Sequence, residues 1–258
     1  MRDLGEKRRQ YWFVIQQLTA RELKRKYARS ALGIVWSVLN PLLSMGVLSL
    51  IFSQMFRRSI QNYPIYYLTG YLLWQAFTGV TNAAMTTLAD NRALLLKVKF
   101  PMELFILTRG YTALINLGYS LVAYGVMLGV FRIPVSWPAL FLVPIVGCLF
   151  LFSLGISYVL SAAYVFFGDV KHLYSVVLTL WMYCSAIFYP AQQLSGPIRG
   201  VVEFNPLYLW IRCLRGAVME ARVPRWEELL LMAVWGFGVY FLGHWFFRGA
   251  REKILQHL

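Results

Sequence analysis

The sequence has few charged residues, and acids are the scarcer sign. Charged residues make up 14% of the 258 positions, with 25 Lys or Arg and only 11 Asp or Glu. Soluble proteins carry about 25% charged residues. Together with a hydrophobic content of 59%, this composition excludes an intrinsically disordered chain. The formal net charge of +14 would suggest a nucleic-acid partner if the chain were soluble. The placement of the charges along the chain shows instead whether they reflect the topology of a membrane protein.

Catalytic and metal-binding motifs are also missing. The sequence holds no phosphate-binding loop of the form G-x-x-x-x-G-K-[ST], no H-E-x-x-H, no G-x-S-x-G and no C-x-x-C. Its three cysteines and three histidines are scattered singly, which argues against a disulfide framework or a zinc site. We therefore expect neither a catalytic residue nor a bound metal or cofactor in this chain.

The charges leave six long stretches that contain no Asp, Glu, Lys or Arg. Each stretch is 19 to 36 residues long, and about 20 apolar residues in a helix cross a hydrocarbon core of about 30 Å. A helix satisfies its own backbone polar groups in lipid. The pattern therefore predicts an all-α membrane protein that forms one domain over residues 1–258. The expected spans are 34–56, 65–89, 102–131, 139–167, 173–190 and 229–247.

The basic residues predict the orientation of these spans. With the amino terminus in the cytoplasm, 17 basic residues lie on the inner side and 8 on the outer side. The positive-inside rule then places both termini in the cytoplasm. Residues 1–33 are expected to form a cytoplasmic interfacial segment, in which the capping-box pattern from Thr19 to Glu22 predicts the start of an amphipathic helix.

Three further segments have their own local signals. Residues 191–228 are too apolar for a solvated loop and too charged to cross, which predicts an outer re-entrant helical pair in which Asn205 caps a helix begun by Pro206. Residues 91–99 predict a short cytoplasmic helix between the second and third spans. The dipeptide Asn40-Pro41 predicts a kink or a break in the first span.

Arg109 is the charge that enters a span most deeply. It lies six residues beyond Glu103, about 9 Å further along the third span. Placing an arginine inside a membrane helix costs about 2.5–3.5 kcal/mol on insertion scales, so we expect it to have a partner or to face a water-filled path.

Five segments in order carry a family resemblance. They are RELKRKYARSALGIVWSVLNPL at 21–42, LLLKVKFP at 94–101, FGDV at 167–170, FYP at 188–190 and NPL at 205–207. In this order and with six spans, the chain resembles the permease subunits of type-2 ABC exporters that move lipid-linked polysaccharides such as O-antigen, capsule or teichoic acid.

The resemblance implies a transport permease rather than an enzyme, in the bacterial inner or plasma membrane. Its implied partners are a second copy of the chain, two copies of an ATP-binding cassette subunit that carries ATP and magnesium, a lipid-linked glycan and membrane lipids, and no nucleic acid. The residues expected to contact the ATP-binding subunit are Asn91, Leu95, Lys97, Lys99, Phe100 and Asp169.

The chemistry of a glycan suggests which side chains would meet it. Sugars offer hydroxyls and flat C–H faces, which suit an aromatic-lined path, and basic residues near the inner leaflet suit the pyrophosphate of a lipid carrier. The expected path residues are Trp36, Trp74, Phe77, Arg109, Trp181, Tyr183 and Tyr189. The expected headgroup residues are Lys24, Arg25 and Arg29.

Two other classes of protein stay open at this stage. A type-2 ABC permease for a drug or a small lipid shares the layout, although the amphipathic amino-terminal segment and the aromatic spans favour a polymer. A membrane-embedded transferase acting on lipid carriers is less favoured, because the expected spans contain no acid apart from Glu103 at the cytoplasmic end of the third.

Overall fold

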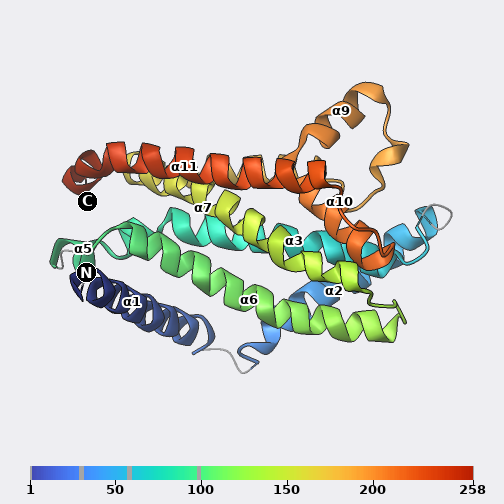
Figure 1. The fold of residues 1–258 in the computed structure, drawn as a ribbon, viewed down its shortest axis with the longest axis horizontal. Coiled ribbons are helices and arrows are strands. Elements are labelled where there is room, and N and C mark those ends of the chain that lie inside the picture. Colours follow the sequence, from blue (N-terminus) through green and yellow to red (C-terminus); the bar gives the residue numbers. More distant parts are fainter. Residues whose placement is uncertain (1, 29–31, 57–59, 98–99, 258) are drawn as a thin grey trace.

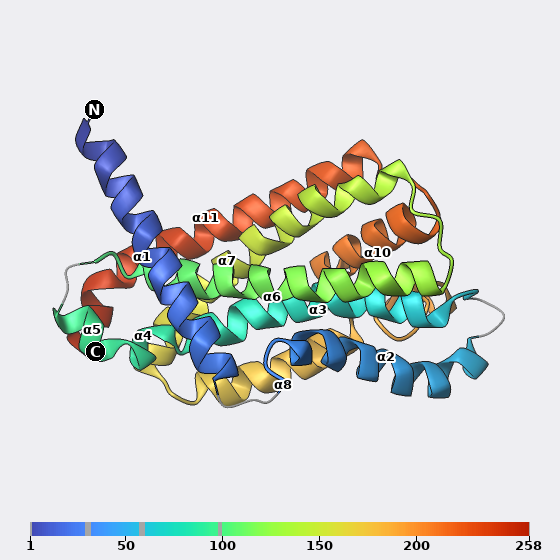
Figure 2. The ribbon, with the colours of Figure 1, turned by 90° about the horizontal axis from the view of Figure 1, so that it is seen from below.

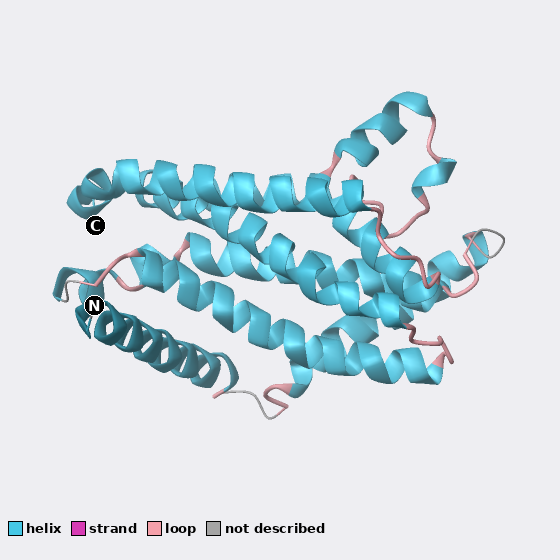
Figure 3. Cartoon of the chain, viewed as in Figure 1, coloured by secondary structure: helices cyan, strands magenta, loops and turns pink. Residues whose placement is uncertain are grey.

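The computed structural model describes residues 2–28, 32–56, 60–97 and 100–257, and this part of the chain is all-helical, without a strand (Figure 3). In chain order, the helices are α1 (Arg2–Tyr27), α2 (Val35–Met55), α3 (Tyr63–Met85), α4 (Thr87–Asp90), α5 (Arg92–Lys97), α6 (Glu103–Val130), the 3-10 turn η1 (Trp137–Phe141), α7 (Leu142–Phe166), α8 (Val170–Tyr183), the 3-10 turn η2 (Ala191–Gln193), α9 (Gly196–Phe204), α10 (Pro206–Met219) and α11 (Trp226–His257).

Helices α3, α6, α7 and α11 run side by side along the long axis of the molecule (Figures 1 and 2). Helix α3 is the central one, because it packs on α2, α6, α7, α8 and α10. Of its 23 residues, 14 are buried. Helix α1 crosses the outside of this bundle and packs on α6 alone among the described elements. The start of α1, the α4–α5 corner and the end of α11 all lie at one end of the bundle (Figure 1).

Four segments are long and apolar enough to cross a membrane, namely Val35–Met55, Glu103–Val130, Trp137–Phe166 and Trp226–His257. They correspond to the first, third, fourth and sixth expected spans. The second expected span corresponds to α3, which is not among these four segments. The fifth is α8, which has 14 residues and is therefore about 21 Å long. Length and composition thus support crossing for four of the six expected spans.

The structure corrects one local prediction and confirms two others. The capping box at Thr19 is wrong as a helix start, because α1 runs unbroken from Arg2 to Tyr27 and the Thr19 side chain is buried in its middle. The short helix expected within residues 91–99 is α5, and Lys99 lies outside the described residues. Asn205 caps α10 as expected, since its side-chain oxygen accepts a hydrogen bond from the Leu207 amide.

A buried arginine holds together the end of the bundle that lies opposite α5 (Figure 1). Arg215 of α10 is 6% exposed and donates hydrogen bonds to the carbonyls of Tyr66, Ala186 and Ile187 at 2.9–3.1 Å. Its guanidinium also lies 3.4 Å from the centre of the Tyr66 ring. The Tyr66 carbonyl belongs to α3, whereas the carbonyls of Ala186 and Ile187 belong to the segment that follows α8, where the helical hydrogen bonding ends. Arg215 therefore supplies these two carbonyls with donors in place of helical backbone amides.

Glycines let α7 and α11 approach backbone to backbone. A Cβ on Gly243 would lie 2.1 Å from the Gly155 carbonyl oxygen, and a Cβ on Gly155 would lie 2.3 Å from the carbonyl oxygen of Val239. Close contact of this kind at small residues is how helices associate in membranes, where hydrophobic burial supplies little driving force. The α7–α11 pair is therefore the rigid side of the bundle.

We expect Gly243→Ala to force α7 and α11 apart. The added methyl group meets backbone atoms that cannot rotate away, so the variant should lose about 1–3 kcal/mol of stability and show a lower unfolding temperature in detergent. Gly238→Ala on the same helix is the matched control, because its Cβ would meet nothing within 4 Å. Equal unfolding temperatures for the two variants would contradict this account of the packing.

Candidate functional site

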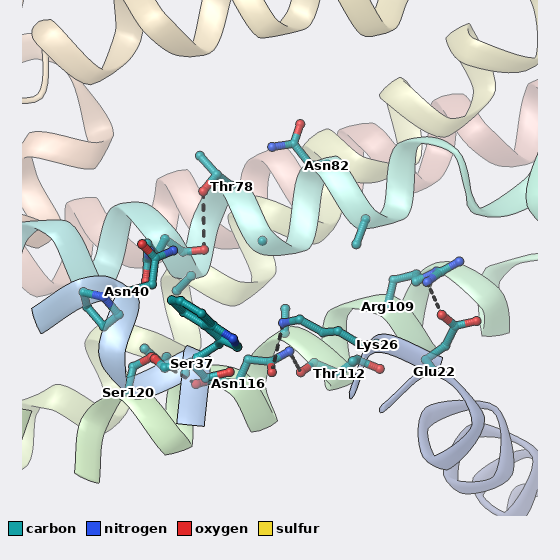
Figure 4. Close-up of a pocket in the computed structure, with 18 of the residues that line it drawn as sticks. Glu22, Lys26, Ser37, Asn40, Thr78, Asn82, Arg109, Thr112, Asn116 and Ser120 are labelled. Carbon is teal, nitrogen blue, oxygen red and sulfur yellow. Dashed lines mark hydrogen bonds and ion pairs between the residues drawn. The ribbon is translucent and has the colours of Figure 1, made fainter. Parts of the chain in front are cut away.

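A polar cavity of about 1010 Å³ lies between α1, α2, α3 and α6. It is bounded at one end by Arg109 and Asp90, near the α4–α5 corner, and at the other by the first turns of α2. Figure 4 labels the lining side chains Glu22, Lys26, Ser37, Asn40, Thr78, Asn82, Arg109, Thr112, Asn116 and Ser120. Most of these side chains are amides and hydroxyls, which both donate and accept hydrogen bonds.

Pro41 helps to form the α2 wall of the cavity. Proline has no N–H, so inside α2 it leaves the carbonyl of Ser37 without its helical donor. The hydroxyl of Ser120 on α6 donates to that carbonyl at 2.9 Å. Helix α2 therefore continues through Pro41 without the predicted break, and the freed carbonyl ties α2 to α6.

Asn116 of α6 joins α1 to the same wall. Its Oδ1 accepts hydrogen bonds from the Tyr27 hydroxyl at 2.7 Å and from the Lys26 ammonium at 3.3 Å. The Tyr27 hydroxyl is also 2.6 Å from the Ser37 hydroxyl on α2. One amide and two hydroxyls thus connect three helices around the cavity.

Arg109 has the partners that its position in a span requires. Its guanidinium donates to a carboxylate oxygen of Glu22 on α1, to Asp90 at 3.3 Å and to the Thr87 hydroxyl at 3.2 Å. The Arg109 side chain is 15% exposed and that of Glu22 is 9% exposed. The expectation of a partner is confirmed, and this ion-paired arginine also lines the cavity.

The remaining cavity groups are open to a ligand. Arg25 lines the cavity, and within the described part of the chain no acidic side chain pairs with it. The amides of Asn40 and Gln75 likewise have no protein hydrogen-bond partner among the described residues. The cavity therefore offers two cations on α1 without an acidic partner among the described residues, Arg25 and Lys26, of which Lys26 also donates to Asn116, and uncharged donors and acceptors deeper between the helices.

The expected path residues fall into three places. Trp36 and Arg109 both line the cavity, towards its opposite ends. Trp74, Phe77 and Trp181 pack instead in the core around α3, with the Phe77 and Trp181 ring centres 5.1 Å apart. Tyr183 is the last residue of α8 and Tyr189 lies in the segment that follows it, where the Tyr189 hydroxyl donates to the Tyr183 carbonyl.

The expected partner-contact residues gather at the end of the bundle that holds α5. Lys97 and Asp169 are exposed, whereas Asn91 and Leu95 are buried and hold the α4–α5 corner in place. Phe100 is partly buried between α5 and α6.

The expected headgroup residues do not share one environment. Arg25 lines the cavity, whereas Lys24 is exposed on α1 away from it. Arg29 lies outside the described residues.

The amides and hydroxyls of the cavity are not among the site residues predicted from the sequence. Asn40 enters that prediction only as the neighbour of Pro41, and Gln75, Asn82 and Asn116 do not enter it. Their signal was available, since each is a polar residue within an expected span, where uncharged polar side chains usually bond across helices or face water. Among the described residues, no group of three or more His, Cys, Asp or Glu side chains is placed to hold a metal ion.

Polar side chains that line a cavity inside a helical membrane bundle are typical of membrane transport proteins, where such side chains mark the substrate pathway. Within this class, the model of the family described as ABC-2 type transporter matches residues 14–219, and the chain belongs to that family.

Three named relatives are similar to the chain over most of its length. The O-antigen export system permease protein RfbA of Myxococcus xanthus is 30% identical, with 96% of each chain covered. The protein of the same name in Klebsiella pneumoniae is 26% identical, with 93% of each chain covered. The polysialic acid transport protein KpsM of Escherichia coli is 19% identical over 93% of this chain and 95% of its own.

We expect Arg109→Met to destabilise the chain by about 3 kcal/mol, because it leaves the buried Glu22 carboxylate without its cation. Adding Glu22→Gln to this variant removes the unpaired charge and should restore part of the loss. The measurement is the unfolding temperature of the purified chain in detergent. As a control, Arg199→Met breaks a pair whose side chains are 50% and 44% exposed, and should cost less than about 1 kcal/mol. A double variant less stable than Arg109→Met would contradict the pairing.

Proposed function

We propose that this chain is the transmembrane subunit of an ATP-driven exporter that moves a lipid-linked polysaccharide out of the cytoplasm. The observation that supports this most directly is the cavity, whose amide and hydroxyl lining suits a chain of sugars. The family membership and the O-antigen and capsule export names of its relatives favour the same substrate class.

The two chemistries of the cavity fit the two parts of such a substrate. Arg25 is available to the pyrophosphate of a lipid carrier, because a guanidinium binds phosphate oxygens through charged hydrogen bonds. Asn40 and Gln75 can exchange hydrogen bonds with sugar hydroxyls, and the ring of Trp36, 48% exposed, can stack on a sugar face. The paired Arg109 adds no net attraction for an anion.

The rest of the assembly follows the family pattern. In this proposal α3 and α8 also cross the inner membrane, so that six crossings leave both termini in the cytoplasm. Two copies of the chain pair with two copies of an ATP-binding subunit, which binds ATP and magnesium. The ATP-binding subunit docks on α5 and on the turn at Asp169. In α5, Leu95 is buried against the bundle, while Leu96 and Lys97 are exposed.

We expect Arg25→Glu to reduce export of the polymer. Losing one charged hydrogen bond to phosphate costs about 1.5 kcal/mol or more, so binding of the lipid-linked glycan should weaken about tenfold. The measurements are glycan binding to the purified complex and the amount of polymer at the cell surface. Lys24→Glu is the matched control, since it changes the net charge equally on the exposed side of α1. Equal losses in both variants would favour a purely topological role for these bases.

We expect Leu96→Asp to release the ATP-binding subunit. Leu96 is 60% exposed on α5, so a carboxylate there leaves the fold intact and places an unsolvated charge in the docking contact. The measurement is co-purification of the two subunits. Leu255→Asp, at an exposed leucine of the carboxyl-terminal helix, is the control. Retention of the ATP-binding subunit by the Leu96 variant would rule out α5 as the docking point.

A further inference from the structure

Helix α1 packs on α6 alone among the described elements, and one of its side-chain contacts reaches the α4–α5 corner. Among its described side chains, Arg21 and Glu22 make ion pairs and hydrogen bonds to the bundle at one level, and Lys26 and Tyr27 make hydrogen bonds one turn further on. The first level binds the corner that precedes α5, and the second binds the cavity wall.

Asn91 is the residue through which the corner reaches α1. Its Oδ1 accepts a hydrogen bond from Arg21 at 2.7 Å. Its Nδ2 donates to the Thr87 carbonyl at 2.8 Å, and its own carbonyl accepts the amides of Leu94 and Leu95, the first turn of α5, at 2.9 and 3.0 Å. Asn91 is 8% exposed. A displacement of α5 therefore moves Asn91, and with it the partner of Arg21.

The same junction is electrically balanced. Arg21 and Arg109 supply two positive charges, and Glu22 and Asp90 supply two negative charges. Arg21 and Glu22 both come from α1 and pair with each other, whereas Asp90 of α4 pairs with Arg109 of α6, which also binds Glu22. Separating α1 from the corner would break the Arg109–Glu22 ion pair and the Arg21–Asn91 hydrogen bond, which favours movement of the two elements as one unit.

The far end of this unit lies in the cavity. Arg25 is one turn beyond Arg21 on α1, and Lys26 and Tyr27 follow it on the cavity wall. Arg21 and Asn91 do not line the cavity themselves. The contacts thus run from α5 through Asn91 and Arg21 into α1, and α1 carries the cations that face the substrate space.

We propose that the Arg21–Asn91 hydrogen bond transmits motion of α5 to the α1 wall of the cavity, and that both residues are positioning residues for export. This inference rests on the proposed function, in which the ATP-binding subunit docks on α5. Closure of that subunit on ATP moves α5, and the junction carries the movement to Arg25 rather than leaving it at the corner.

The test uses the complete complex with its ATP-binding subunit in membrane vesicles. Three quantities are measured, namely binding of the lipid-linked glycan, the rate of ATP hydrolysis and the amount of polymer exported per ATP hydrolysed. Arg21→Ala is the main variant, because that side chain is 51% exposed and its removal leaves no cavity in the packing. Arg9→Ala is the matched control, an exposed base on the same helix about 18 Å away.

In Arg21→Ala, we expect export per ATP to fall about 2- to 30-fold, the range that substitutions along a coupling network produce, with glycan binding and ATP hydrolysis unchanged. Arg21→Lys, which can still donate to Asn91, should recover most of the export. Adding Arg21→Ala to Asn91→Ala should cause no further loss, because Arg21 acts through Asn91, whereas Asn91→Ala by itself also removes the hydrogen bond to the Thr87 carbonyl.

Unchanged export per ATP in Arg21→Ala would overturn the inference, as would additive losses in the double variant. A loss of glycan binding in step with export would also overturn it, because Arg21 would then act in binding. These outcomes differ from failure of the proposed function, in which the unaltered complex itself would neither bind nor export a lipid-linked glycan.

Discussion

A charge or an unpaired polar group inside an apolar helical bundle has to be matched by the protein itself, because hydrocarbon offers no hydrogen bonds. Two arginines show how this requirement shapes the structure. Arg215 is matched by backbone carbonyls, and in this way it fixes the irregular segment after α8 to α3 and α10. Arg109 is matched by carboxylates, and those carboxylates belong to α1 and α4. Each arginine therefore determines which neighbouring element lies beside it.

The bundle has one side held by close backbone contact and another held by polar bonds. On the α7–α11 side, Gly155 and Gly243 bring two backbones together, and a methyl group at either position collides with main-chain atoms. On the α1–α2 side, hydrogen bonds to Asn116 and Ser120 join α1 and α2 to α6 beside a cavity of about 1010 Å³. Dense backbone contact resists displacement, whereas a few hydrogen bonds beside a water-accessible cavity can exchange for water at little cost. Any change of shape is therefore easier on the side where the cavity lies.

The charge pattern and the local turn chemistry predicted the helical membrane class, the short helix before Pro101 and the cap at Asn205, because each depends only on neighbouring residues. The same kind of local signal failed at Thr19, where the capping-box residues lie inside a helix that tertiary contacts continue. Helix facing was harder to predict. Trp36 and Trp74 are equally aromatic and equally within expected spans, yet one lines the cavity and the other is 6% exposed in the core. Which way a ring points depends on how whole helices pack, and a search for ionisable and aromatic residues also passes over amides such as Gln75.

The lining of the cavity bears on how a long polymer could move through a protein without being trapped. A binding site with several unpaired charges would hold a phosphate tightly and release it slowly, whereas neutral hydrogen bonds in contact with water contribute only about 0.5–1.5 kcal/mol each. In this chain the strongest charges near the cavity, Arg109 with Glu22 and Asp90, already satisfy one another. The cations without an acidic partner among the described residues, Arg25 and Lys26, lie on α1, a helix that packs on α6 alone among the described elements. A charged end of a substrate would therefore be held by an element that can move, and its uncharged sugars would meet only exchangeable hydrogen bonds, which is the arrangement that permits release.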